Sequence, residues 1–172
     1  VIYGNALKRQ SLIKNMKKYD VIITSYDLLK RDIDYYKDFE FKYIIADEAQ
    51  YIKNNNTKNA KALKQLNGKT RFALTGTPIE NGLADLWSIF DYLMPGYLAD
   101  YSHFKSRYES LILHDDDEAL DLLKKRVQPF ILRRTKKDVL KDLPDKIEEI
   151  YYCKMDEKQE ELYKAYVQNI KN

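Results

Sequence analysis

Two adjacent carboxylates, Asp47 and Glu48, directly follow the apolar run from Tyr43 to Ala46. Such a run is typical of a strand in a parallel sheet that helices cover on both faces. Parallel sheets place their chemistry at the carboxyl ends of the strands. An Asp there can hold Mg²⁺ through water, and a neighbouring Glu can activate a water molecule. The pair therefore indicates phosphoryl-transfer chemistry, and a solvated strand end before a turn is the alternative.

A second apolar run, residues 71–74, ends in two threonines around a glycine. We expect it to form a strand beside the first one. Thr77, Pro78 and Glu80 have the types and spacing of a capping box with proline at the first helical position. This pattern predicts an amphipathic helix that begins at Pro78.

The hydroxyl of Thr75 has no comparable local role. It is a candidate to bond the carboxylate of Asp47 or Glu48 and so to report the state of a bound nucleotide. Gly76 indicates a backbone conformation, or a close approach, that a side chain would obstruct.

Four segments of the chain resemble, in the same order, motifs of the Swi/Snf-type ATPases of helicase superfamily two, which include bacterial HepA-like members. Residues 20–26 (DVIITSY) are similar to motif Ib, and residues 47–54 (DEAQYIKN) to motif II. Residues 73–81 (ALTGTPIEN) are similar to motif III. Residues 130–139 (FILRRTKKDV) with 143–146 (LPDK) resemble the segment that joins the two motor lobes.

The resemblance implies an ATPase that uses ATP and Mg²⁺. In that family Asp47 would hold Mg²⁺ through water, Glu48 would activate the attacking water, and Gln50, in a DEAQ box, would sense the γ-phosphate. Residues 75–77 would couple this state to the grip on DNA.

The resemblance also implies contacts with the phosphate backbone of double-stranded DNA. Thr24, Ser25 and Tyr26 lie between an expected strand and an expected helix, where hydroxyls and backbone amides could meet a phosphate without reading bases. Ser25 could instead only cap the helix. Arg133 and Arg134 fit either a solvated basic face or a contact with phosphate or the other lobe.

The sequence contains no phosphate-binding G-x-x-x-x-G-K-[ST] motif. Residues 68–70 imitate its tail, but Leu63 stands where the first glycine belongs, so we expect a turn there. The family's second lobe, with its arginine finger, is also missing. We therefore expect a piece of a motor that is inactive on its own.

The amino-acid composition limits the kinds of site and the cellular location that we expect. A net charge of +3 over 172 residues is too small to indicate nucleic-acid binding by itself. The single cysteine, Cys153, excludes an internal disulfide and a cysteine-cluster metal site. No apolar stretch approaches the roughly 20 residues of a membrane span. We expect a cytoplasmic protein, and the frequent Lys, Asn, Ile and Tyr favour a bacterium with an A/T-rich genome.

Short apolar runs that alternate with helical periodicity predict an α/β fold. Strands are expected near residues 1–3, 21–23, 43–46 and 72–74. Helices are expected near residues 6–17, 58–66 and 78–93, with a helical region from Tyr101 onward. The third helix carries an apolar stripe that we assign to the core, formed by Leu83, Leu86, Trp87, Phe90 and Leu93.

Two features of the later chain are interpreted structurally. The acids at residues 115–118 favour a helix start over a metal cluster, because they lack a ligand-spaced partner. Asp156 and Gln159 predict the cap of a last helix, whose apolar stripe has lost its partner in the second lobe. We expect that stripe to fold back on the lobe or to pack against a second copy, giving a dimer created by truncation.

The sequence thus predicts a partial RecA-like parallel sheet flanked by helices and followed by a helical extension. The divisions are residues 1–98 for the later part of the first lobe, 99–150 for the extension and inter-lobe segment, and 151–172 for the start of the second lobe. The chain is predicted to be part of an ATP-dependent translocase that moves on double-stranded DNA and remodels protein–DNA complexes. The alternatives are a non-catalytic interaction module and an RNA helicase lobe.

Overall fold

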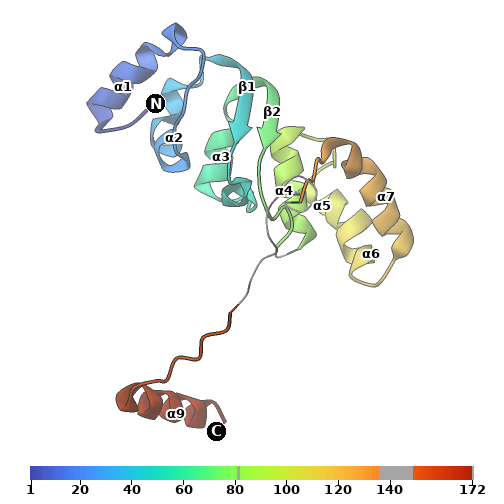
Figure 1. Cartoon of the computed structure of the whole chain (residues 1–172). Coiled ribbons are helices and arrows are strands. Elements are labelled where there is room, and N and C mark those ends of the chain that lie inside the picture. The colour runs from blue at the N-terminus through green and yellow to red at the C-terminus, as the bar shows by residue number, and fades with distance from the viewer. Residues whose placement is uncertain (81, 136–148, 172) are drawn as a thin grey trace. The chain divides into compact units, whose positions relative to one another are not determined.

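The computed structural model describes residues 1–80, 82–135 and 149–171. They fall into two compact units, Val1–Ile131 and Leu132–Asn172. Figure 1 shows the elements of the first unit, which are α1 (Ala6–Lys14), α2 (Tyr26–Asp32), β1 (Glu40–Ala46), α3 (Lys58–Lys64), β2 (Asn67–Ala73), α4 (Leu83–Leu93), α5 (Tyr101–Phe104), α6 (Ser110–Ile112) and α7 (Asp117–Val127). Short 3₁₀ turns at Met16–Lys18, Ile33–Tyr35, Ala49–Ile52 and Gln128–Phe130 and a π turn at Lys105–Glu109 complete it. The second unit contains α9 (Glu157–Lys171).

The two strands lie side by side and run parallel, as expected, with Ile44 opposite Arg71 and Ala46 opposite Ala73. Helix α3 supplies the crossover between them. Backbone pairing continues past both strand ends, because the Leu74 amide donates to the Ala46 carbonyl at 2.8 Å and the Ala49 amide donates to the Leu74 carbonyl at 2.8 Å. The segments that follow β1 and β2 are therefore neighbours.

Two expected strands are not formed. Residues 1–3 and 21–23 belong to no strand or helix. The Ile2 amide donates to the Ile23 carbonyl at 2.8 Å, and this one bond does not make a ladder. The turn expected at residues 68–70 is also wrong, because these residues belong to β2. The glycine signal there reflects packing: a Cβ at Gly68 would overlap Ile44 Cδ1.

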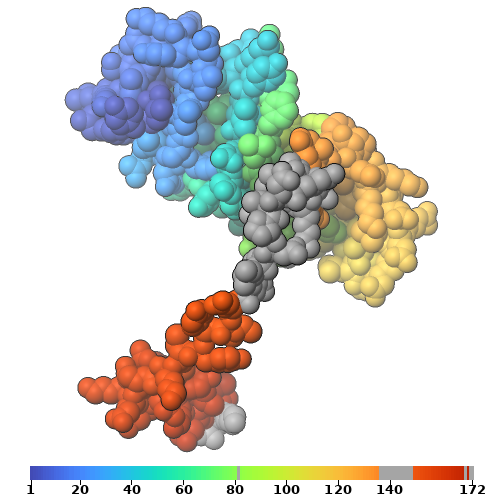
Figure 2. Space-filling model, viewed as in Figure 1, coloured from blue at the N-terminus to red at the C-terminus, as the bar shows by residue number. Residues whose placement is uncertain are grey.

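Within the first unit, the described elements cover the sheet on one face, whereas cover on both faces was expected. Ile44 and Ala46 are buried in a core with residues from α1, α2, α3 and α4. On the opposite face Tyr43 is 54% exposed, Ile45 62% and Phe72 46%. Figure 2 shows atoms of this part of the chain, in cyan and green, at the surface that faces the viewer. The apolar run thus alternates between buried and exposed residues in the part that the structure describes.

A second apolar cluster joins α4 to the helical extension. Leu86, Trp87 and Phe90 of the expected stripe are buried there, and Leu83 packs against them. Their partners in the cluster are Leu98, Phe104, Tyr108, Leu123 and Val127. The Trp87 indole donates to the Ala99 carbonyl at 3.1 Å, so the ring is a core residue, as expected. Helices and short turns run from Tyr101 to Phe130, as expected, whereas residues 131–135 and 149–156 are not helical.

Helix α4 begins at Leu83 and not at Pro78, so the predicted capping box is wrong. Gly82, with φ of +150°, precedes the helix in a conformation that favours glycine. The Glu80 amide donates to Asp85 Oδ2 at 3.1 Å, and the Glu80 carboxylate accepts from Lys53. Asp85, five residues later, and the distant Lys53 thus bond the groups of Glu80 that a capping box would use.

Other local predictions hold. Asp116 caps α7 by accepting from the Ala119 amide at 2.9 Å, and Asp156 accepts from the Gln159 amide at 2.9 Å at the start of α9. Tyr163 and Tyr166 on the stripe of α9 are more than half exposed. Packing of this stripe against a second copy stays a prediction. Among the described helices, none is long and apolar enough to cross a membrane.

Candidate functional site

In the segment that follows β1, two exposed acidic residues lie next to two buried apolar residues. Ala49 and Ile52, in the 3₁₀ turn, are fully buried. Asp47 and Glu48 are exposed beside them. The Ile52 carbonyl also accepts from the buried Ser88 hydroxyl of α4 at 2.8 Å. Apolar anchors and helix α4 thus fix a short stretch of backbone from which two carboxylates project.

Glu48 has a left-handed backbone, with φ of 48° and ψ of 53°. This conformation is uncommon for a residue other than glycine, and it lies between the end of β1 and the start of the 3₁₀ turn. The Glu48 amide donates to Asp47 Oδ1 at 2.9 Å. The Gln50 amide nitrogen donates to Glu48 Oε2 at 2.6 Å. The side chain of Asp47 therefore fixes the backbone amide of Glu48, and the side chain of Gln50 fixes its carboxylate.

Thr75 meets Gln50 rather than a carboxylate. The Thr75 hydroxyl donates to Gln50 Oε1 at 3.1 Å, and the Thr77 amide donates to Thr75 Oγ1 at 3.1 Å. The expected bond from Thr75 to Asp47 or Glu48 is not made, because Gln50 stands between them. The polar groups of the two strand ends form one chain, from Glu48 through Gln50 and Thr75 to Thr77.

Gly76 shows no need for a glycine in this structure. A Cβ placed there meets nothing within 4 Å, and Gly76 is not among the glycines with positive φ. The expectation of an obstructed backbone at Gly76 is therefore wrong for this conformation of the chain.

Lys53 is a site residue that the sequence analysis quoted but gave no role. It is only 7% exposed. Its ammonium lies 2.9 Å from Glu80 Oε2 and 3.8 Å from Asp85 Oδ2, and it donates to the Thr77 hydroxyl at 3.4 Å. A lysine beside a buried isoleucine, with acids about 30 residues later, is the only trace of this arrangement in the sequence. Lys53 thus connects Thr77 and Glu80, in the irregular segment after β2, to the first strand end.

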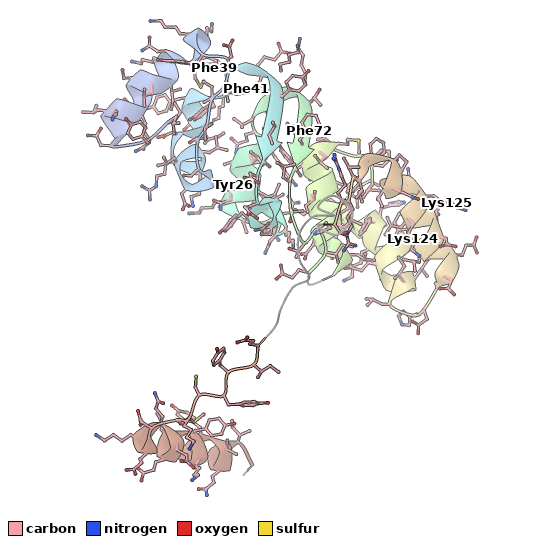
Figure 3. All side chains as sticks on the ribbon, viewed as in Figure 1. Tyr26, Phe39, Phe41, Phe72, Lys124 and Lys125 are labelled. Carbon is pink, nitrogen blue, oxygen red and sulfur yellow. The ribbon has the colours of Figure 1, made fainter. Side chains whose placement is uncertain are left out.

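Tyr26 also reaches the first strand end, a contact that the sequence did not indicate. It points from the start of α2 toward the segment after β1 (Figure 3), and its hydroxyl donates to the Asp47 carbonyl at 2.7 Å. Ser25 Oγ accepts from the Leu28 amide at 3.4 Å, which confirms its role as the cap of α2. The Thr24 hydroxyl oxygen is buried, so only the backbone of Thr24 could meet a phosphate.

Arg133 and Arg134 are exposed and belong to the second unit. Their predicted contact with phosphate or the other lobe stays a prediction. Residues 136–148 of the matching segment lie outside the described residues.

Comparison with known proteins decides the family. A model of the SNF2-related domain matches residues 1–172. This chain belongs to the SNF2-related domain family. The recognition of a Swi/Snf-type fragment of helicase superfamily two is thereby confirmed.

Two curated relatives of this SNF2-related chain come from distant organisms. It is 41% identical over 178 residues to the human TATA-binding protein-associated factor 172, covering 96% of this chain and 10% of that protein. It is also 41% identical over 160 residues to an uncharacterized ATP-dependent helicase of Mycoplasma genitalium, covering 93% of this chain and 15% of that protein. The chain thus spans a small part of its relatives.

A solved structure supports the fold. The Sulfolobus solfataricus SWI2/SNF2 ATPase core in complex with double-stranded DNA is 52% identical, with a TM-score of 0.67 over 88% of this chain and 33% of that one. The two-stranded parallel sheet with its helices therefore corresponds to part of an SNF2 ATPase core, as the predicted fold class required.

The donor set of this SNF2-related chain fits Mg²⁺ held largely by water and phosphate. Asp47 and Glu48 offer exposed carboxylate oxygens, which suit a hard cation. No group of three or more His, Cys, Asp or Glu that could enclose a metal occurs among the described residues. Mg²⁺ commonly binds ATPases through one or two carboxylates plus substrate phosphates, and the exposed carboxylates of Asp47 and Glu48 could supply such ligands.

Proposed function

We propose that this chain is the later part of the first RecA-like lobe of an ATP-dependent motor that moves on double-stranded DNA. The observation that carries the proposal is the hydrogen-bonded chain from Glu48 through Gln50 to Thr75 at two adjacent strand ends. It joins the Glu48 carboxylate after one strand to the Thr75 hydroxyl after the next. The names of the relatives, an ATP-dependent helicase and an SWI2/SNF2 ATPase core, support the same function.

In this function Mg²⁺, when bound with ATP, neutralises charge on the phosphates. Asp47 would hold it through water. Glu48 would orient and deprotonate the attacking water, because its carboxylate is exposed beside Asp47. Gln50 would sense the γ-phosphate, since its amide already bridges Glu48 and Thr75. A change at Gln50 would reach residues 75–77 directly.

The proposed track is the phosphate backbone of the duplex. The resemblance to motif Ib assigns the contact to residues 24–26, and the DNA-bound Sulfolobus relative supports a duplex as partner. Arg133 and Arg134 would add charge, and binding should weaken steeply with salt because phosphate contacts release counterions. The name of the human relative, a TATA-binding protein-associated factor, supports a DNA-bound protein complex as the remodelling target.

The experiment is steady-state ATP hydrolysis by the complete protein, with and without duplex DNA. Glu48→Gln should lower kcat by roughly 10² or more and leave nucleotide binding intact, because it removes the base but keeps the hydrogen-bonding shape. Asp47→Asn should instead weaken Mg²⁺-dependent binding of ATP. Asp121→Asn, an exposed acid on α7, is the matched control.

Near-normal turnover by Glu48→Gln would overturn the assignment of the water-activating residue. A complete protein without ATP hydrolysis would favour a non-catalytic interaction module that keeps the shape of the lobe. Stimulation by single-stranded RNA and not by duplex DNA would favour an RNA helicase.

A further inference from the structure

The left-handed backbone of Glu48 needs an external support. A residue other than glycine in this region is strained by about 1 kcal/mol or more and persists only where its surroundings determine it. The same backbone sets the direction of the Glu48 carboxylate. Whatever holds the peptide group between Asp47 and Glu48 therefore also aims the carboxylate.

Hydrogen bonds hold that peptide group at both ends. Its N–H donates to Asp47 Oδ1 at 2.9 Å, within the same segment. Its carbonyl accepts from the Tyr26 hydroxyl at 2.7 Å. Gln50 grips only the far end of the Glu48 side chain, at Oε2. Tyr26 is thus the side chain from a distant part of the sequence that orients the peptide itself.

Tyr26 is well placed for this task. It is the first residue of α2, which Ser25 caps, and its ring lies 5.8 Å from the ring of Tyr51. The start of a capped helix and the contact with the Tyr51 ring thus place the Tyr26 hydroxyl at the Asp47 carbonyl.

We infer that Tyr26 is a positioning residue of the hydrolytic centre, whose hydroxyl holds the Asp47–Glu48 peptide and so aims the Glu48 carboxylate at the water. The inference rests on the proposed function for its catalytic consequence. It also gives segment 24–26, the expected DNA contact, a direct bond to the peptide group that precedes the water-activating Glu48. A shift of this segment on DNA would reach Glu48 through a single hydrogen bond.

Tyr26→Phe in the complete protein tests the role, because it deletes one oxygen and keeps the ring. With duplex DNA present, kcat should fall about five- to tenfold, the order expected for one neutral hydrogen bond. The KM for ATP should stay within about twofold, since a positioning residue does not bind ATP. Tyr19→Phe, which removes a hydroxyl from a ring that is 61% exposed, is the matched control and should behave as wild type.

Two further measurements separate positioning from a general structural role. In the double variant Tyr26→Phe with Glu48→Gln, the first change should cost nothing more, because the group that it aims is already lost. In hydrogen–deuterium exchange of the nucleotide-free protein, the peptide that covers residues 46–53 should exchange several-fold faster in Tyr26→Phe than in Tyr19→Phe.

An unchanged kcat or unchanged exchange in residues 46–53 would overturn the inference. So would an equal further loss in the double variant, which would show that Tyr26 acts elsewhere. If Glu48→Gln itself left hydrolysis intact, the proposed function would fail, while the exchange measurement would still decide whether Tyr26 holds the peptide.

Discussion

The segments that follow the two strands lie side by side but are held in different ways. The one after β1 forms a 3₁₀ turn whose anchors, Ala49 and Ile52, are fully buried. Residues 76–80 after β2 are exposed and have no regular structure. Side chains of the first segment, Gln50 and Lys53, hold the second. The first segment is thus a fixed reference, and the second keeps its place only while these contacts last.

Lys53→Met should break this relation most strongly. It removes the cation that lies between Glu80 and Asp85, and breaking a buried charge pair is strongly destabilising, although the 60% exposure of Glu80 moderates the effect. We expect thermolysin to cleave within residues 75–82 of the complete protein about ten times faster, and kcat to fall by about the same factor through misplacement. Lys61→Met on α3, an exposed lysine, is the control. Equal cleavage rates would mean that the second segment holds itself.

Thr75→Val should break the link with a smaller effect. The change keeps the shape but removes the hydroxyl that joins Gln50 to the Thr77 amide. We expect hydrolysis without DNA to stay within about twofold and its stimulation by duplex DNA to fall about fivefold, the order of one hydrogen bond. Thr75→Ser, which retains the hydroxyl, should restore stimulation. If Thr75→Val lowered the rates of hydrolysis with and without duplex DNA by the same factor, Thr75 would not couple DNA binding to hydrolysis.

Ser25→Ala should have the smallest effect. It weakens only the cap of α2, the helix that begins at Tyr26. The loss of a helix cap lowers the free energy of unfolding by about 0.5–2 kcal/mol. We expect a value near the lower limit for Ser25, because its hydrogen bond to the Leu28 amide is long, at 3.4 Å. We expect duplex affinity to fall two- to threefold, equally on all sequences, because backbone contacts read no bases. Filter binding to several unrelated duplexes would measure it. A variant that changed the preference among sequences would contradict backbone tracking.

Local patterns predicted the parts of this molecule that local bonds determine. The caps at Ser25, Asp116 and Asp156 depend on groups three residues away, and the structure has all three. The predicted start of α4 was wrong because the carboxylate of Glu80 bonds Lys53, 27 residues earlier, while its amide bonds Asp85. No pattern of residue types signals a long-range contact of this kind.

The candidate site divides in the same way. Motif order placed Asp47, Glu48, Gln50 and Thr75 in one neighbourhood, and parallel pairing of β1 with β2 brings their segments together. The sequence could not show that Gln50 stands between Thr75 and the carboxylates, or that Glu48 is left-handed. These details follow from the direction of the chain after Ala46. Exposure of Ile45 likewise depends on which elements cover the sheet and not on the run of apolar residues.

The burial of Lys53 makes its amine a natural reporter of the second segment. With a side chain only 6% exposed, the ammonium is shielded from acylating reagents as long as Thr77, Glu80 and Asp85 stay in place around it. Exposed lysines such as Lys61 should acylate quickly under the same conditions. The rate of acylation at Lys53 can be measured by mass spectrometry in each nucleotide state. It would therefore report how often the segment after β2 moves away from Lys53, without an added label.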